Sequence, residues 1–128
     1  MTIRPDTLQP DLLRAALQAA QDVGTPFWLY EAEPIRRRVA QLGAFDCVRY
    51  AQKANSNTHI LRLLRSLGVM VDAVSLGEIE RALHAGYWPG TPDHEVVFTA
   101  DIIDELTLRR VVELGIPVNC GSPDMIRQ

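Results

Sequence analysis

The chain has 128 residues, of which 47% are hydrophobic and 23% are charged, and its formal net charge at pH 7 is -3. This composition is typical of a globular protein, and the negative charge argues against a nucleic-acid surface, which is normally basic. No apolar run approaches the ~20 residues that span a bilayer, and the N-terminus lacks the blocks of a signal peptide. We therefore expect a cytoplasmic protein whose partners are small molecules rather than nucleic acids or membranes. The spacing of its 2 cysteines and 3 histidines predicts neither a disulfide framework nor a metal site.

The first predicted element is an amphipathic helix near the N-terminus. Between Pro10 and Val23 the apolar residues at positions 12, 13, 16, 17 and 20 share one helical face, and Gly24 follows as a stop. Residues 1–24 are therefore interpreted as an N-terminal helical segment that precedes a larger body.

From residue 25 onward, short apolar runs alternate with helical stretches. Starts of predicted strands recur roughly every 20 to 25 residues with a helix after each of the first four, which is typical of consecutive right-handed βαβ units. A parallel sheet follows from this pattern. The predicted helices begin near 34, 58, 76 and 102, a last helix begins at Ser122-Pro123, and the predicted strands cover 27–30, 47–51, 69–74, 95–99 and 116–120.

Two architectures fit this periodicity: an open doubly wound sheet, and a (β/α)₈ barrel of which about five strands are present. The pattern alone does not choose between them, and no glycine-rich phosphate motif follows any strand. In both architectures the functional edge lies at the C-terminal ends of the strands. The polar residues expected at this edge are Tyr30, Glu31, Gln52, Lys53, Asn55, Asp72, Ser75, Thr99, Asp101, Asn119 and Ser122.

Lys53 is the only lysine among 13 basic residues, the others being arginines, and it lies two residues after the second predicted strand. A lysine at a strand end is ordinarily a solvated surface residue. The alternative is a lysine that forms a Schiff base with a carbonyl group, because a desolvated ammonium loses its proton readily whereas a guanidinium does not. Position alone leaves both interpretations open.

Two acidic residues follow on the next βα unit. Asp72 lies inside an apolar run, where an ionised carboxylate requires a cation or hydrogen-bond donors. Ser75 and Glu78 have the spacing of a capping box, in which each side chain satisfies a free backbone N–H at the start of a helix. This capping role is expected whatever else the two residues do.

Four segments stand out in chain order: YAQKANSN (50–57), DAVSLGEIERALHAGY (72–87), VVFTAD (96–101) and IPVNCGS (116–122). Together they closely resemble the N-terminal region of bacterial diaminopimelate decarboxylases. That family belongs to the barrel-type, alanine racemase-like pyridoxal-phosphate enzymes, which also include ornithine and arginine decarboxylases. The resemblance implies an α/β fold, a partial (β/α)₈ TIM barrel of the pyridoxal-phosphate type, in which residues 25–128 form the first five βα units and the rest of the barrel and a C-terminal β domain are absent.

The resemblance also implies a site. In that family the lysine of the Y-A-x-K-A-N segment carries pyridoxal 5′-phosphate, which identifies Lys53 as the expected catalytic and cofactor-binding residue. The family pattern places Asp72 close to this lysine and matches Glu78 to the acidic position that follows, so both are expected to bind the cofactor. The implied activity is that of a carbon–carbon lyase of lysine biosynthesis, which converts the amino acid meso-diaminopimelate into L-lysine and carbon dioxide.

In the family, the glycine-rich phosphate loop, the histidine that stacks on the pyridine ring and the acid that pairs with its nitrogen all lie on later segments. We therefore expect the isolated chain to be inactive, the full-length parent to be a homodimer, and the fragment to self-associate through uncovered sheet surfaces. Two alternatives stay open. One is another barrel-type decarboxylase for ornithine or arginine, and the other is a non-catalytic half-barrel that serves as a binding or structural module.

Overall fold

The computed structural model describes residues 9–90 and 94–128, and the chain divides into two units, Met1–Glu33 and Pro34–Gln128. The first unit contains helix α1 (Pro10–Val23), which has the bounds that the apolar spacing predicts. A proline at the first helical position begins α1, and the N–H of Gly24 donates to the Ala20 carbonyl at its end. Residues 1–8 of the expected N-terminal segment lie outside the described residues.

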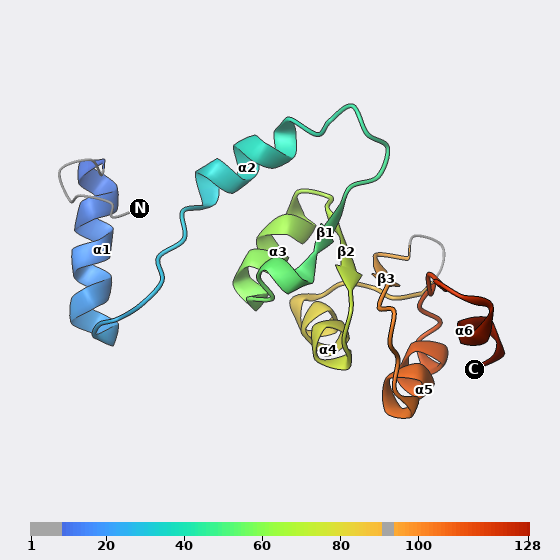
Figure 1. Cartoon of the computed structure of the whole chain (residues 1–128). Coiled ribbons are helices and arrows are strands. Elements are labelled where there is room, and N and C mark those ends of the chain that lie inside the picture. Colours follow the sequence, from blue (N-terminus) through green and yellow to red (C-terminus); the bar gives the residue numbers. More distant parts are fainter. Residues whose placement is uncertain (1–8, 91–93) are drawn as a thin grey trace. The chain divides into compact units, whose positions relative to one another are not determined.

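The second unit contains a three-stranded parallel sheet in the order β1-β2-β3 (Figure 1). The central strand, β2, is paired on both sides, because Val71 lies opposite both Tyr50 and Val96. Beyond β3 the sheet continues with one parallel bridge between Phe98 and Val118. The strands are β1 (Arg49–Ala51), β2 (Met70–Ala73) and β3 (Val96–Phe98), and the helices are α2 (Ala32–Ala40), the 3₁₀ helix η2 (Gln52–Ala54), α3 (Thr58–Ser66), α4 (Leu76–Ala85), α5 (Glu105–Glu113) and α6 (Pro123–Arg127).

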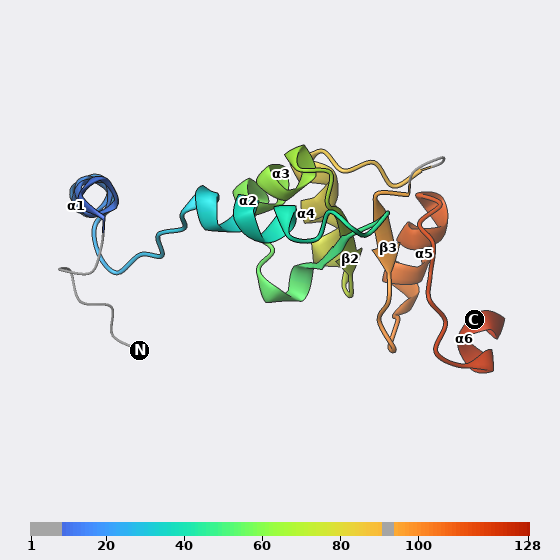
Figure 2. The same ribbon diagram turned by 90° about the horizontal axis from the view of Figure 1, so that it is seen from above.

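The hydrophobic core lies on one face of this sheet. Alternate residues of β2 and β3 are fully buried there, and they pack with residues of α3, α4 and α5 in a single cluster. Figures 1 and 2 show α4 beside β2, with which it is in contact. Residues 70, 72, 97 and 99, which alternate with the buried ones, are only partly buried. The largest members of the core are Phe98, Leu61, Ile79, Val71, Val96 and Val111.

Strand order and the one-sided core select between the two architectures that the sequence leaves open. A doubly wound sheet reverses its strand order and places helices on both faces. Here β1, β2, β3 and Val118 follow one another across the sheet in chain order, and the buried faces of α3, α4 and α5 belong to one core. This is the arrangement expected of consecutive units of a (β/α)₈ barrel, in which helices form a single outer layer. The predicted α/β fold is thereby confirmed.

Two of the five predicted strands look different in the structure. Residues 27–30 form no strand, and Trp28 within them is 88% exposed. Residues 116–120 contribute only the bridge through Val118. An apolar run indicates that a segment can become a strand, but its ladder requires backbone partners on a neighbouring segment. Whether these two segments form full strands therefore depends on neighbouring backbone segments, which their own composition does not specify.

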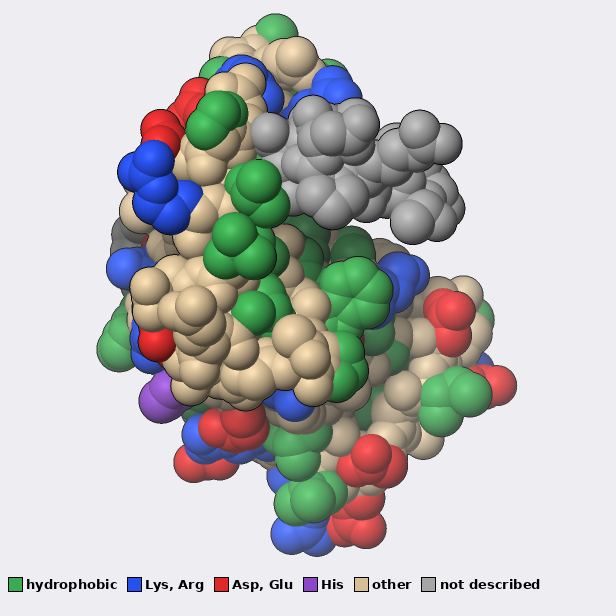
Figure 3. Space-filling model, turned by 90° about the vertical axis from the view of Figure 1, so that its left-hand side faces the viewer, with side chains coloured by type: hydrophobic (Ala, Val, Ile, Leu, Met, Phe, Trp, Pro, Cys, Tyr) green, Lys and Arg blue, Asp and Glu red, His purple; other side chains and the backbone are tan. Residues whose placement is uncertain are grey.

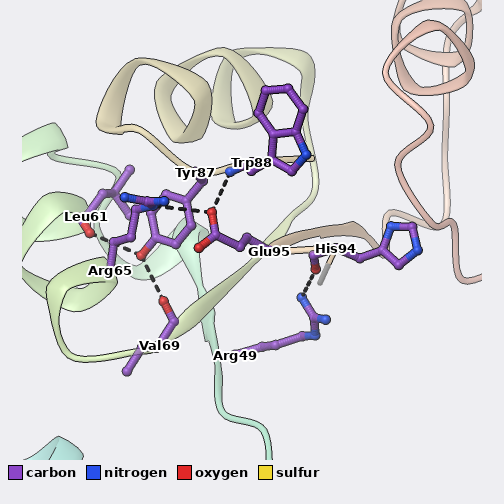
Figure 4. A network of polar contacts seen from close by, with 8 residues as sticks. All are labelled: Arg49, Leu61, Arg65, Val69, Tyr87, Trp88, His94 and Glu95. Carbon is purple, nitrogen blue, oxygen red and sulfur yellow. Dashed lines mark hydrogen bonds and ion pairs between the residues drawn. The ribbon is translucent and has the colours of Figure 1, made fainter. Parts of the chain in front are cut away.

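A polar network holds α3 and the segment after α4 against the sheet (Figure 4). The hydroxyl of Tyr87, which is 2% exposed, lies 3.1 Å from the carbonyl oxygens of both Leu61 and Val69. Burial, reinforced by the nearby Glu95 carboxylate, raises the pKa of Tyr87, so the hydroxyl remains a proton donor. Arg65 pairs with Glu95 at 3.2 Å and lies over the Tyr87 ring.

No helix among the described residues is long and apolar enough to cross a membrane.

Helix α5 begins later than its apolar pattern predicts, because Asp104 provides its N-cap. The Asp104 carboxylate accepts hydrogen bonds from the backbone N–H of Thr107 at 2.8 Å and from the Thr107 hydroxyl at 3.0 Å. Both bonds favour the ionised carboxylate and hold the pKa of Asp104 below its usual value.

This cap predicts a pH dependence of stability. A carboxyl group whose pKa is lower in the folded than in the unfolded chain stabilises the fold above its unfolded pKa, and this stabilisation is lost as the pH falls through the folded pKa. In urea unfolding from about pH 6 to about pH 3, we expect the wild-type chain to lose more stability below about pH 4 than the Asp104→Asn variant does. Asparagine keeps the capping oxygen without the charge, so it is the matched control. The same loss in both chains would refute this explanation.

Candidate functional site

Lys53 lies directly beyond the C-terminal end of β1, within the 3₁₀ helix η2. Its side chain is exposed, and none of the residues that the structure describes forms a hydrogen bond or an ion pair with it. The helix η2 is in contact with β2, the neighbouring strand. The structure thus places the lysine at the C-terminal edge of the parallel sheet, with an ammonium group that no other described side chain engages.

The turn that carries Lys53 is fastened on both sides by polar contacts. On the strand side, the hydroxyl of Tyr50 donates to the Asn55 carbonyl. On the helix side, the Asn57 side chain caps α3. These contacts restrict the backbone on which the lysine is mounted. The distances are 3.2 Å from Tyr50 Oη to the Asn55 oxygen, 3.0 Å from Ser56 Oγ to the Gln52 oxygen, 2.9 Å from the Asn57 nitrogen to Asn55 Oδ1 and 2.9 Å from the His59 nitrogen to Asn57 Oδ1.

Gln52 does not join the edge, and the expectation that it lies there with Lys53 is wrong. Its side chain is fully buried. Tyr50 lies opposite the buried Val71, so strand alternation directs residue 52 toward the same helix-covered face as Ala73. Neither the amide nitrogen nor the amide oxygen of Gln52 has a hydrogen-bond partner among the described residues.

Asp72 lies in the central strand, where Ala51 and Val97 are its partners on either side. The hydroxyl of Thr99 donates to Asp72 Oδ1 at 2.6 Å, and Oδ2 accepts no hydrogen bond from the described part of the chain. Partial exposure and this hydrogen bond compensate for a carboxylate within an apolar strand. The sequence places Thr99 at the edge, but the contact with Asp72 depends on the register of two strands 27 residues apart.

Glu78 lies in the first turn of α4 and is engaged by the backbone. The Ser75 hydroxyl oxygen accepts a hydrogen bond from the Glu78 N–H at 3.3 Å, and Glu78 Oε2 accepts one from the Val74 N–H at 2.8 Å. The Ser75 half of the predicted capping box is confirmed, whereas the Glu78 carboxylate binds the N–H of Val74, one residue before the N-cap, instead of the Ser75 N–H. The Glu78 side chain therefore links the end of β2 to the start of α4.

The remaining residues expected at the edge are placed less tightly. Asp101 and Asn119 are exposed, and Ser122 accepts a hydrogen bond from the Met125 N–H at 3.4 Å as the cap of α6. Tyr30 and Glu31 are exposed and follow no strand. In the ranges 9–90 and 94–128, no group of three or more histidine, cysteine or acidic side chains could hold a metal ion.

The edge therefore combines an unengaged primary amine after β1 with the carboxylates of Asp72 in β2 and Glu78 in the first turn of α4. A lysine amine can form a covalent bond to a carbonyl carbon, and carboxylates stabilise a neighbouring cationic group. This donor set fits a cofactor that carries both an aldehyde and a protonated ring. Fold and site together define a parallel βα domain of the barrel type that carries a lysine and two carboxylates at its C-terminal edge.

Comparison with known proteins identifies this domain. Residues 33–128 match the family described as "Pyridoxal-dependent decarboxylase, pyridoxal binding domain". The chain belongs to this family, and the cofactor of the domain is accordingly pyridoxal phosphate.

Similar proteins confirm the resemblance to diaminopimelate decarboxylases. The chain is 64% identical over 110 residues to a diaminopimelate decarboxylase of Streptomyces coelicolor, which covers 86% of this chain and 25% of that protein. A crystal structure of diaminopimelate decarboxylase superposes with a TM-score of 0.86 at 55% identity, covering 98% of this chain and 30% of the other. Another, a mutant enzyme from Helicobacter pylori complexed with L-lysine, gives a TM-score of 0.76 at 33% identity and covers 88% and 29%. The chain thus spans only about a quarter to a third of these relatives.

The contact between Glu78 and Val74 predicts different effects for two substitutions. Glu78→Gln keeps a side-chain oxygen for the Val74 N–H, so its free energy of unfolding should stay within about 0.5 kcal/mol of wild type. Glu78→Ala removes the acceptor and should lose about 0.5–2 kcal/mol, as other cap deletions do. Urea unfolding at neutral pH measures both values. An equal loss in the two variants would show that the charge, rather than the hydrogen bond, stabilises the start of α4.

Proposed function

We propose that this chain is the lysine-bearing part of a pyridoxal-phosphate-dependent decarboxylase that converts meso-diaminopimelate into L-lysine and carbon dioxide. The observation that carries the proposal is the position of the only lysine, at the end of β1 and beside the strand that holds Asp72. High identity to proteins named diaminopimelate decarboxylase supports this substrate over ornithine or arginine, and the L-lysine in the Helicobacter pylori structure supports the product. A place in lysine biosynthesis, and a cytoplasmic location, follow from this proposed reaction.

Each of the three predicted site residues has a role in this proposal. Lys53 is the catalytic residue and would hold the cofactor covalently through Nζ. Asp72 would stabilise a cationic group beside the lysine through Oδ2, the oxygen that the Thr99 contact leaves available. Glu78 would present its second oxygen to the cofactor while Oε2 remains on the Val74 N–H. When bound, pyridoxal phosphate supplies the sink for the electrons that remain on the substrate as its carboxyl group leaves.

The fastened turn around Lys53 supports this assignment physically. A reacting side chain must be held near its productive geometry by neighbours that are themselves fixed. The contacts of Tyr50, Ser56 and Asn57 restrain the backbone on both sides of Lys53. In domain terms, we propose that residues 1–24 precede the barrel and that residues 25–128 form its first five βα units.

We also propose that the full-length parent is a homodimer and that the isolated chain self-associates. One supporting observation is the sheet face opposite the core, which the described helices leave partly exposed. Another is the exposure of large hydrophobic side chains, such as Ile102 at 88% and Ile126 at 75%. On the face shown in Figure 3, hydrophobic side chains lie among charged ones. Removing exposed apolar side chains from water favours association.

Chemical trapping tests the central assignment. After incubation with pyridoxal phosphate and reduction with borohydride, we expect peptide mapping by mass spectrometry to find the cofactor on Lys53. Lys53→Arg keeps the positive charge but forms no Schiff base, so it should lose this label. The α-amino terminus is the other amine of the chain and gives the non-specific background. Labelling at the terminus alone in the wild-type chain would contradict the proposal.

The short span of the chain predicts that it does not complete the reaction by itself. We expect the purified 128-residue chain to release no carbon dioxide above background from carboxyl-labelled meso-diaminopimelate. The physical reason is that one amine and two carboxylates do not replace the phosphate and ring-nitrogen contacts that we assign to other parts of the parent. A full-length diaminopimelate decarboxylase assayed in parallel is the positive control. Release that disappears in Lys53→Arg would disprove this expectation.

A further inference from the structure

The hydrogen bond from Thr99 to Asp72 differs from the other contacts at this edge. At 2.6 Å between Oγ1 and Oδ1, it lies in the range of strong bonds to ionised acceptors. It also joins side chains of neighbouring parts of the sheet, whereas the Glu78 carboxylate is held by a backbone N–H close to it in sequence. A single substitution can therefore remove this bond while leaving the backbone ladder in place.

Both partners of this bond have fixed backbones. Asp72 is paired with Ala51 on one side and Val97 on the other. The N–H of Thr99 donates to the Ala73 carbonyl at 3.1 Å, which extends the contact between β2 and the end of β3. The hydroxyl of a β-branched threonine on such a backbone has few available directions. The hydrogen bond between Thr99 and Asp72 therefore restricts the orientation of the Asp72 carboxylate, whose backbone the strand pairing already holds.

The geometry also separates the two oxygens of Asp72. Oδ1 is occupied by Thr99, and Oδ2 accepts no hydrogen bond from the described residues. If the carboxylate could rotate freely, either oxygen could face a ligand, and binding would have to restrict that rotation. A carboxylate that is already oriented avoids this loss of freedom, so it binds a cationic group more tightly.

We propose that Thr99 is a positioning residue of the cofactor site: its hydroxyl orients Asp72 so that Oδ2 faces the cofactor held at Lys53. This inference rests on the proposed function, since it takes pyridoxal phosphate on Lys53 as the ligand. It assigns to Thr99 no contact with the cofactor and no part in the chemistry. Its effect passes through Asp72 alone.

The test uses the full 128-residue chain with pyridoxal phosphate itself, and measures how much cofactor borohydride traps on Lys53 as its concentration is varied. Thr99→Val removes the hydroxyl and keeps the shape, whereas Thr99→Ser keeps the hydroxyl. We expect Thr99→Val to require roughly ten-fold more cofactor for half-maximal trapping, the size of effect expected for loss of a hydrogen bond to a charged group. Thr99→Ser should stay close to wild type.

A double-mutant cycle separates positioning from general stability. In an Asp72→Asn background, Thr99→Val should cause no further loss of trapping, because the residue through which it acts is already altered. Urea unfolding of each variant shows whether it is folded under the trapping conditions. If Thr99→Val is unfolded, Thr99→Ala provides a second hydroxyl-free side chain for the same comparison.

The outcomes are distinguishable. Wild-type trapping on Lys53 with unchanged affinity in folded Thr99→Val overturns the role of Thr99 and leaves the proposed function standing. An equal loss in the wild-type and Asp72→Asn backgrounds also overturns it, because Thr99 would then act independently of Asp72. Absence of trapping on Lys53 in the wild-type chain overturns the proposed function for this chain, and the inference falls with it.

Discussion

The pairing of β2 with a parallel strand on each side is the constraint on which the candidate site depends. The register that sets Ala51 opposite Asp72 also sets Asp72 opposite Val97. The residues that follow these strands must then emerge at the same edge, because parallel strands share one direction. Lys53 and Thr99, which are 46 positions apart in sequence, are brought to either side of the strand that holds Asp72 by this ladder rather than by any local motif.

The one-sided core explains why polar groups can occupy the other face. Helices α3, α4 and α5 bury the face that carries Val71 and Phe98, and most of the apolar burial of the second unit is there. Asp72 and Thr99 lie on the alternate face, which is partly exposed and therefore accommodates a carboxylate at smaller cost than the core does. The face covered by helices thus provides most of the stabilising burial, and the opposite face of the same strands carries the candidate site. The Tyr87 network reinforces the core face only, where it joins α3 to the segment after α4.

Local signals in the sequence predicted local structure well. Proline and glycine at the ends of α1, and the Ser75 cap of α4, act within one or two turns, so the sequence contains both partners of each interaction. The predictions that fail are those that depend on residues far away in the sequence or on backbone partners outside the segment itself. Residues 27–30 have the composition of a strand without forming one, and Gln52 looked like an edge residue until the register showed which face it occupies. The contact between Thr99 and Asp72 could not be predicted without the strand register either. The importance of Lys53, in contrast, was inferred from the family resemblance and from its being the only lysine of the sequence.

Gln52 and Lys53 show how closely the two faces meet at this edge. They are consecutive residues of η2, which begins directly after β1, yet one side chain is fully buried and the other is exposed. A buried amide that lacks a hydrogen-bond partner among the described residues costs about 1–3 kcal/mol, so local stability does not explain this glutamine. Departures from local stability are expected where a sequence also serves a site. Gln52 lies directly beside the proposed cofactor lysine, on the turn whose backbone the surrounding hydrogen bonds hold in place.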